Sequence, residues 1–413
     1  MNPIFARIAD SSTAIILKGY GWLPDRRRAS KDGVAETRFI GRRATGVCGP
    51  AAVRFFYDEA NIRRSGAVPG FVQDSLFGRG AVQGLDDGAH RRRKSMFLEL
   101  LTPPGRVDDL VASTGKAWDA AVPRWRREPS VVLFDEAARV LTRGVCDWAA
   151  IPVGDDDRDL ARDLVATVDG FATGGPRHFR ARRARQRRER WLADLVIRVR
   201  DGRHPAPAGS VLATIANYRE ADGHLLPPHT AAVELLNVIR PDVAVCWFLA
   251  YAAHALHRWP HWRDRLVQGD KEFAVAFAHE VRRFYPFAPF IGGLARRDLS
   301  YQGHRIPEGS MVLLDLYGQN HDPSLWEDPY VFSPARFEAH PPGAHDLIPQ
   351  GGGDPATGHR CPGEPAVVAQ LANLSVRLAR LDYTVPPQDM SISLRRIPAR
   401  PRSGVRISVR SGG

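Results

Sequence analysis

The chain has 413 residues, of which 44% are hydrophobic and 25% charged, a composition typical of a folded globular protein rather than a disordered one. No apolar run approaches the roughly 18 residues that a membrane-spanning helix needs. The apolar stretch from Ala14 to Leu17 is too short for a secretory signal, so we expect a cytoplasmic protein without a membrane span. The formal net charge is +12, but only five of the 58 basic residues are lysines, which indicates a general preference for arginine rather than a polyanionic partner.

The predicted elements begin with short strands within 34–47. Apolar side chains spaced at the helical period then predict helices over 51–64, 89–101, 106–127, 133–149, 157–171, 177–200 and 229–257. A further helix over 271–285 is closed by Pro286.

The spacing of apolar residues changes after this helix. Residues 296–318 alternate and turn at Gly303 and Gly309, which predicts a pair of hairpins. A Pro- and Gly-rich stretch from 322 to 360 precedes a helix over about 362–381, and the tail over 390–410 is interpreted as closing strands. Because no repeat or linker interrupts the chain, we expect one large domain over 1–413, mainly α with small β-sheets.

One of the four cysteines lies in an unusual setting. Cys48, Cys146 and Cys246 are far apart, and their spacing indicates neither a disulfide framework nor a zinc site. Cys361 instead follows a glycine-rich loop, "GGGDPATGHR", and precedes the start of a predicted helix. A thiolate at a helix N-terminus is stabilised by the helix dipole, and glycines allow a loop to approach a flat ligand closely. The alternative is a buried, inert cysteine.

Two upstream motifs argue against a buried, inert cysteine. Glu280 and Arg283 of "EVRR" lie three apart on one helix face, as an ion pair requires. "FSPARF" at 332–337 supplies Arg336 as a third member. In this order, followed by the glycine-rich Cys361 loop, the motifs resemble the cytochrome P-450 superfamily over nearly the whole chain. The resemblance implies the P-450 fold, a haem b cofactor (iron protoporphyrin IX), and Cys361 as its iron-ligating thiolate.

The long helix over 229–257 carries a second unusual pair, Arg240 and Pro241. A proline inside a helix costs about 3 kcal/mol and predicts a kink. An unpaired arginine in so apolar a stretch is costly and needs an anion. Asp242 could supply that anion within the protein, although residues two apart do not share a helix face. The other interpretation is a substrate carboxylate held by the guanidinium.

P-450 monooxygenases carry an acid and a threonine at this place in the helix. The Arg-Pro pair instead resembles the hydrogen-peroxide-using fatty-acid peroxygenases, as do "LFGRGAVQGLDDGAHRRRK" at 76–94, "RRFYPFAPF" at 282–290 and "PQGGGDPATGHRCPGE" at 349–364. This resemblance implies a fatty acid or related carboxylic acid on Arg240, hydrogen peroxide as oxidant, and no redox partner. The bound carboxylate would act as general acid and base, and the α or β carbon would be hydroxylated.

The resemblance also assigns the remaining site residues. Gln83 occupies a position that holds Gln in enzymes that mainly hydroxylate and His in an alkene-forming decarboxylase, so we expect hydroxylation. Residues that match positions at the haem propionates are Arg64, His90, Lys94 and His359, any one of which could instead be a surface charge. Residues expected to line the pocket are Phe77, Phe171, Phe287 and Phe290, with core packing as the alternative for each.

Other functions remain open at this point. The protein could be a decarboxylase that forms terminal alkenes, a biosynthetic P-450 acting on a non-fatty carboxylate, or a monooxygenase that depends on a redox partner. A haem sensor or a nucleic-acid-binding protein is a further class, because "RHFRARRARQRRER" at 177–190 holds eight arginines. This run lacks interleaved aromatic residues beyond Phe179, so we interpret it as a solvated helix face and expect no nucleic-acid partner.

Overall fold

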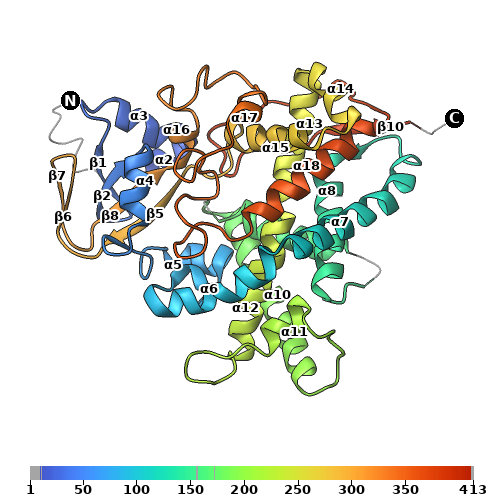
Figure 1. Ribbon diagram of the computed structural model, residues 1–413, viewed down its shortest axis with the longest axis horizontal. Helices are drawn as coiled ribbons and strands as arrows, with labels where there is room; N and C mark the ends of the chain where they lie inside the picture. Colours follow the sequence, from blue (N-terminus) through green and yellow to red (C-terminus); the bar gives the residue numbers. More distant parts are fainter. Residues whose placement is uncertain (1–9, 11, 155–156, 172, 411–413) are drawn as a thin grey trace.

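The computed structural model describes residues 10, 12–154, 157–171 and 173–410. A large helical body lies beside a smaller region built around a five-stranded sheet, which is at the left in Figure 1. The predicted fold class, mainly α with small β-sheets in a single domain, is confirmed; the domain limits 1–413 stay a prediction. Within the described residues, no helix is both long enough and apolar enough to cross a membrane.

The five-stranded sheet joins strands from both halves of the chain in the order β1-β2-β8-β5-β3. Only the contact between β2 and β8 is parallel. A hairpin of β6 and β7 turns at Gly303, as predicted, but the second hairpin predicted at Gly309 is absent from the described strands, because β8 pairs with β2 and β5. A third sheet has the order β4-β10-β9. The strands are β1 Ala35–Phe39, β2 Arg42–Val47, β3 Ile62–Arg63, β4 Val131–Val132, β5 Phe290–Ala295, β6 Leu299–Tyr301, β7 His304–Ile306, β8 Met311–Asp315, β9 Tyr383–Thr384 and β10 Arg406–Val409.

The long helices of the body surround the buried pair α12 and α13, which runs through its middle in Figure 1. The helices before this pair are α2 Ser12–Lys18, α3 Trp22–Arg28, α4 Pro50–Tyr57, α5 Gly70–Val72, α6 Asp87–Leu101, α7 Pro104–Trp125, α8 Leu133–Ala149, α9 Arg158–Asp169, α10 Pro176–Arg200 and α11 Val211–Ala216. The pair and the later helices are α12 Pro228–Val243, α13 Val245–Arg258, α14 His261–Gln268, α15 Lys271–Phe284, α16 Leu316–Asn320, α17 Arg336–Ala339 and α18 Glu364–Arg380.

The predicted kink in the helix over 229–257 is present as a break. α12 ends at Val243 and α13 begins at Val245, with Ala244 between them. Pro241 has no backbone N–H, so the helix loses a hydrogen bond in its last turn. The N–H of Trp247 then donates to the carbonyl of Ala244 at 3.1 Å, a tighter turn than the α-helical one.

Two sequence predictions were wrong in extent. The helix predicted over 51–64 ends at Tyr57, because residues 62–63 form β3 and pair with β5 in the sheet. The tail over 390–410 forms one strand, β10, and an isolated bridge between Ile392 and Pro401. The prolines of this tail lack the N–H groups that a longer strand ladder needs.

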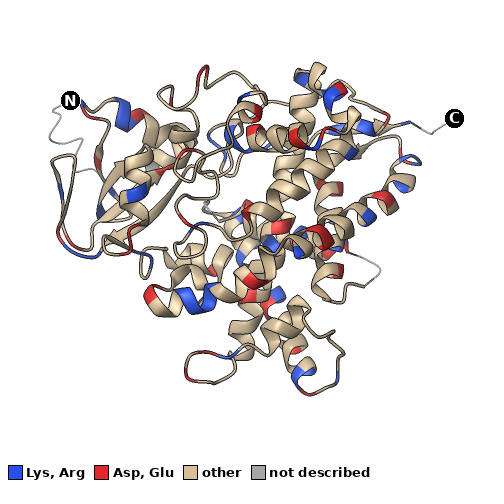
Figure 2. Ribbon diagram, viewed as in Figure 1, with Lys and Arg blue, Asp and Glu red and all other residues tan. Residues whose placement is uncertain are grey.

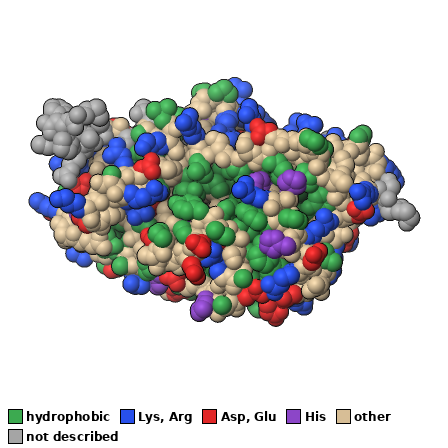
Figure 3. Space-filling model, turned by 90° about the horizontal axis from the view of Figure 1, so that it is seen from above, with side chains coloured by type: hydrophobic (Ala, Val, Ile, Leu, Met, Phe, Trp, Pro, Cys, Tyr) green, Lys and Arg blue, Asp and Glu red, His purple; other side chains and the backbone are tan. Residues whose placement is uncertain are grey.

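Charged side chains are spread over the whole molecule. Figure 2 shows Lys and Arg interspersed with Asp and Glu along the helices, as expected for a general preference for arginine. On the face seen in Figure 3, apolar side chains gather near the middle, with basic and acidic side chains around them.

Candidate active site

The glycine-rich loop before Cys361 is packed tightly against α4. Gly351 and Gly353 have φ of +94° and +78°, which favour glycine. A Cβ on Gly351 would lie 2.3 Å from the Tyr57 hydroxyl oxygen, and one on Gly352 would lie 2.5 Å from Val53 Cγ1. These glycines therefore allow close packing of the loop on α4, in addition to the approach to a ligand that the sequence suggested.

Cys361 lies between this loop and the start of α18, in a half-buried position. Its backbone N–H donates to the carbonyl of Gln350 at 3.3 Å, and Gln350 Nε2 lies 3.8 Å from Sγ as a donor. Burial raises the pKa of the Cys361 thiol, and Glu364 adds to this, whereas Lys94 lowers it. The helix start is thus not sufficient to ionise the thiol, but a coordinated metal deprotonates such a ligand outright.

The predicted ion pair behind this loop is present. Glu280 and Arg283 are both fully buried and meet through two hydrogen bonds of 2.7 Å. Arg336 Nε lies 3.2 Å from Glu280 Oε2, as the motif order indicated. Arg283 also donates to the carbonyl of Asn320 at 2.9 Å, so the pair ties α15 to the end of α16.

A second charged cluster beside Cys361 was missed by the sequence analysis. Arg282 Nε donates to Gln350 Oε1 at 3.0 Å, and its guanidinium also pairs with Glu364 in the first turn of α18. Arg360 Nε donates to the other oxygen of Glu364 at 2.7 Å. Arg282 directly precedes the Arg283 that the motif uses, and this adjacency was the only signal available in the sequence.

The four residues predicted to meet haem propionates lie close together. The rings of His90 and His359 are stacked with centroids 3.7 Å apart. Arg64 Nη1 donates to the carbonyl of Gly292 at 3.0 Å, and Lys94 Nζ donates to the carbonyl of Arg360 at 2.9 Å. The Lys94 ammonium is therefore already used to hold the Cys361 loop.

Burial and mutual repulsion depress the basicity of this cluster. The pKa of His90 falls to about 4 and that of Lys94 to about 8, mainly because both are buried. Asp86 is the nearby carboxylate, 3.8 Å from His359 Nε2, and its oxygens also accept the backbone N–H groups of Arg64 and Ser65. His90 Nδ1 is buried and has no hydrogen-bond partner. The cluster thus has more basic groups than anions and fits the addition of carboxylates.

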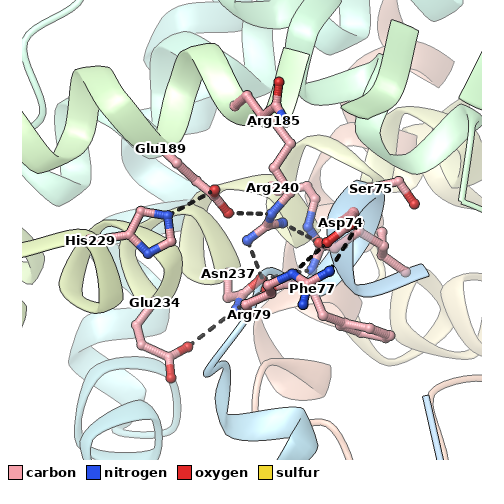
Figure 4. A network of polar contacts seen from close by, with 12 residues as sticks. Asp74, Ser75, Phe77, Arg79, Arg185, Glu189, His229, Glu234, Asn237 and Arg240 are labelled. Atoms are coloured by element: carbon pink, nitrogen blue, oxygen red, sulfur yellow. Dashed lines mark hydrogen bonds and ion pairs between the residues drawn. The ribbon is translucent and has the colours of Figure 1, made fainter. Parts of the chain in front are cut away.

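Arg240 is buried on α12 with only 6% of its surface exposed. Its Nη2 donates to Asn237 Oδ1 at a long 3.4 Å, and its Nε has no hydrogen-bond partner. Within the described part of the chain, no carboxylate forms an ion pair with it. Burial, together with repulsion from Arg185, lowers the pKa of Arg240 to about 9. Figure 4 shows both guanidinium groups among the polar residues of α10 and α12.

Asp242 does not pair with Arg240, so that alternative from the sequence was wrong. Its Oδ1 accepts a hydrogen bond from Gln370 Nε2 of α18 at 2.5 Å. Burial raises the pKa of Asp242 to about 7. The two side chains leave α12 in different directions because residues two apart lie on different faces of a helix.

Gln83 and Phe77 belong to a segment of short helical turns, η2 Gln73–Phe77 and η3 Val82–Gly84, that the sequence did not predict. Asn237 Nδ2 donates to the carbonyl of Phe77 at 2.9 Å and lies 3.4 Å from Gln83 Oε1. A cavity of about 240 Å³ is lined by this segment, and its walls include Arg64, Phe77 and Gln83. The predicted pocket residues Phe77 and Gln83 therefore share one cavity.

Arg185 of α10 holds the same segment from the other side. Its guanidinium donates to the carbonyls of Leu76 and Phe77, at 2.7 Å for Phe77, and its Nε pairs with Glu189 at 2.5 Å. Gly78 has φ of +85°, and a Cβ there would lie 2.4 Å from Arg185 Nη2. Together with Asn237, Arg185 is a residue of the site that the sequence analysis missed.

The remaining phenylalanines are placed differently from one another. Phe287 packs against Phe248 with ring centroids 5.0 Å apart, and Phe171 packs against the large core of the body. Phe290 packs against Trp22 and Phe39, with centroids 5.7 and 5.6 Å away, beside the five-stranded sheet. These contacts support the core-packing alternative for Phe290, and pocket lining by Phe171, Phe287 and Phe290 stays a prediction.

The arginine run over 177–190 lies on α10 and is partly occupied by ion pairs. Arg187 and Arg188 both pair with Asp163 of α9, and Arg177 pairs with Asp169. These contacts fix α10 against α9, which is a structural role for part of the run.

Comparison with known proteins agrees with the geometry of the site. The sequence profile of the family described as cytochrome P-450 matches residues 270–364, the segment that carries Glu280, Arg283, Arg336 and Cys361. Among curated sequences, a cytochrome P-450 monooxygenase, ple5B, of Rhodocybe pseudopiperita is 43% identical over 66 residues, which are 16% of this chain. This chain spans only 13% of the length of that relative.

Solved structures match over nearly the whole chain. Cytochrome P450SP alpha (CYP152B1) in complex with (R)-ibuprofen is 40% identical with a TM-score of 0.94, covering 97% of this chain and 98% of that one. Cytochrome P450EX alpha (CYP152N1) with myristic acid is 34% identical with a TM-score of 0.92, covering 97% and 96%. A variant of cytochrome P-450 OleT in complex with arachidonic acid is 32% identical with a TM-score of 0.93, again covering 97% and 96%.

The fold and the Cys361 region thus define a haem-thiolate oxidoreductase. The chain belongs to the cytochrome P-450 family, and its predicted resemblance to the peroxygenase branch is confirmed by these structures.

Proposed function

We propose that the protein is a peroxygenase that uses hydrogen peroxide to hydroxylate a fatty acid, or a related carboxylic acid, at its α or β carbon. The observation that carries this proposal is the buried guanidinium of Arg240, which has no carboxylate partner among the described residues. An unpaired buried charge of this kind is costly. A carboxylic-acid substrate would supply the missing anion.

The residues around Cys361 fit a haem b cofactor. Cys361 would ligate the iron, the glycine-rich loop that carries it is held closely against α4, and Arg64, His90 and His359 form a buried basic group for the two propionates. Lys94 would act chiefly through the loop carbonyls that it already holds. When bound, thiolate-ligated haem supplies peroxide activation and oxygen-atom transfer.

Arg240 would bind and orient the substrate. A guanidinium can hold a carboxylate through two parallel hydrogen bonds, which fixes the direction of the acyl chain as well as its end. The carboxylate so held can take a proton from hydrogen peroxide and return it to the departing oxygen. The protein then needs no acid of its own beside Arg240, and the nearby Asp242 is in fact directed toward Gln370.

The same observation weighs against a monooxygenase that depends on a redox partner. Such enzymes carry an acid and a threonine for proton delivery where this chain has Arg240 and Pro241. The solved relatives are in complex with myristic acid, arachidonic acid and (R)-ibuprofen, all carboxylic acids, and only the first two are fatty acids. The proposal therefore extends to carboxylic acids with other carbon skeletons.

Gln83 bears on the outcome of the reaction. Its carboxamide oxygen lies 3.4 Å from Asn237 Nδ2, so it is turned toward the same amide that contacts Arg240. A neutral amide is a poor proton donor compared with an imidazolium. We therefore infer hydroxylation rather than decarboxylation to a terminal alkene as the main reaction.

The test is turnover of a defined acid with peroxide alone. Haem-loaded protein, myristic acid and hydrogen peroxide, without reductase or nicotinamide cofactor, are expected to give α- or β-hydroxymyristic acid by mass spectrometry. Turnover that appears only with ferredoxin, ferredoxin reductase and NADPH would overturn the proposal in favour of a monooxygenase.

A further inference from the structure

Asp242 is a buried acid that the proposed chemistry does not use. It lies on α12 two residues after Arg240, with 4% of its surface exposed. Its partner Gln370 is 1% exposed and lies on α18, the helix that begins three residues after Cys361. The hydrogen bond between them therefore joins the helix of the substrate anchor to the helix of the proposed iron ligand.

The far end of this link is fixed in the core. Thr114 Oγ1 of α7 donates to Gln370 Oε1 at 3.0 Å, so both ends of the Gln370 amide are bonded. Thr114 lies at a close contact of α7 and α8, because a Cβ on Gly144 would lie 2.6 Å from its Cα. Ser113 Oγ also donates to the Gly144 carbonyl at 2.9 Å. Gln370 is thus held by a rigid helix contact.

The near end of the link lies where α12 is weakest. Pro241 removes one backbone hydrogen bond, and the helix stops at Val243. On the other face of this turn, Arg240 has a single long hydrogen bond, to Asn237. The Asp242 bond is therefore the short polar contact that fixes this turn of α12 against the rest of the protein. Since burial raises the pKa of Asp242 to about 7, the carboxyl carries less than a full charge near neutral pH.

We propose that Asp242 is a positioning residue which, through Gln370, sets the distance between Arg240 and Cys361 and thereby selects which carbon of a bound acid is oxidised. This inference rests on the proposed function. The α and β carbons of an acid are adjacent, so a small displacement of the anchor along the chain exchanges one for the other. Reactions of held substrates are sensitive to misplacements of about 1 Å.

The experiment compares product ratios, which do not depend on how much of the protein is folded or loaded with haem. Asp242→Val removes the acceptor, and Asp242→Asn keeps it. With myristic acid and peroxide, we expect Asp242→Val to change the ratio of α- to β-hydroxy acid by at least about threefold. We expect Asp242→Asn to keep the wild-type ratio. Calorimetric titration of myristic acid without peroxide should show a dissociation constant several times larger for Asp242→Val but not for Asp242→Asn.

A double-mutant cycle distinguishes the effect of losing the Asp242–Gln370 bond from a general destabilisation of the fold. Gln370→Met cuts the same bond from α18, so it should reproduce the Asp242→Val ratio, and the double variant should add nothing further. Should Asp242→Val not fold, Gln370→Met serves in its place. Glu136→Gln is the matched control, because Glu136 is a largely buried acid that bonds Arg124 and Trp125 at the other end of α7 and α8.

The outcomes separate this inference from the proposed function. A wild-type protein that gives no hydroxy acid with peroxide overturns the proposed function. Wild-type turnover with an unchanged ratio in Asp242→Val and Gln370→Met overturns the positioning role alone, as does an equal change of ratio in Glu136→Gln.

Discussion

The two sides of the proposed haem site are organised in opposite ways. Behind Cys361, the two buried arginines of α15 each have an acid: Arg283 pairs with Glu280, and Arg282 pairs with Glu364. Around Arg240, the guanidinium has one long contact and no acid among the described residues. The first region is complete without a ligand, whereas the second leaves a charge unbalanced. The difference indicates which side holds a permanent group and which side receives a transient anion.

The largest expected effect comes from the ligand itself. Cys361→Ser should abolish the absorption band of the reduced carbon monoxide complex that is typical of thiolate-ligated haem, because a serine oxygen is a weaker and harder ligand. Difference spectroscopy of purified protein checks this. A retained band would show that the thiolate comes from another cysteine, and Cys48→Ser is the matched control.

The region behind Cys361, where the buried arginines are paired, can be tested by breaking the Glu280–Arg283 ion pair. Glu280→Gln leaves Arg283 buried without its acid, and breaking a buried pair in this way costs about 3–5 kcal/mol. We expect a corresponding loss in the free energy of unfolding, measured with urea. A change below about 1 kcal/mol would contradict the structural role of the pair.

Removal of the unpaired charge at Arg240 should have the opposite effect on the free energy of unfolding. Arg240→Met removes a charge that has no partner, so the free energy of unfolding should stay the same or rise. Peroxide-dependent oxidation of myristic acid should fall at least about 100-fold because the acid loses its anchor. The visible spectrum of the haem should be kept. Activity within about twofold of the wild type would place the anchor elsewhere.

The pH dependence of stability sharpens the comparison at Asp242. Its pKa is raised from 3.8 to about 7 in the folded protein, so the folded state binds this proton more tightly than the unfolded state. The wild type should therefore lose stability, relative to Asp242→Asn, as the pH rises from about 4 to about 7. Each unit of pKa shift corresponds to about 1.4 kcal/mol, so the difference in the free energy of unfolding is at most about 4 kcal/mol.

Urea unfolding at both ends of this range, about pH 4 and about pH 7, measures the difference. Parallel stability curves for the wild type and Asp242→Asn would mean that the carboxyl ionises freely in the folded protein.

The smallest expected effect concerns the partition between two products. Gln83→His places a proton donor where the carboxamide now faces Asn237. We expect a larger share of terminal alkene and an almost unchanged total turnover, by gas chromatography of the products from myristic acid. Gln83→Glu has nearly the same size but lacks the donor, and it should form no additional alkene.

The sequence predicted the Cys361 side of the site better than the Arg240 side. Glu280 and Arg283 lie three apart on one helix, and short motifs carry Arg336 and Cys361, so local spacing was sufficient. The long helices were also predicted closely, because their apolar faces repeat at the helical period. Burial could not be predicted from the sequence. At Cys361 its effect on the thiol pKa is larger than that of the helix N-terminus, so the pKa is raised.

Contacts between distant segments could not be predicted from spacing. The Asp242–Gln370 bond joins residues 128 apart in sequence, and the contact of Arg185 with Phe77 joins residues 108 apart. The turns that hold Gln83 were missed because η2 and η3 are too short to show a period. Phe290 follows a proline, as Phe287 does, yet it packs on Trp22 because it belongs to β5 of the sheet.

The double hold on the Phe77 carbonyl has a consequence for how a substrate is admitted. Arg185 and Asn237 donate to the same oxygen from two helices, α10 and α12. Moving the segment outward would remove the carbonyl acceptors of Leu76 and Phe77 from the buried Arg185 guanidinium and leave it with Glu189 alone, which is unfavourable. The segment is therefore expected to keep its position while an acid enters. Selectivity among acyl chains then follows from the preformed shape of the pocket, because the pocket does not rearrange around each substrate. A site of this kind loses little entropy on binding and discriminates sharply by size.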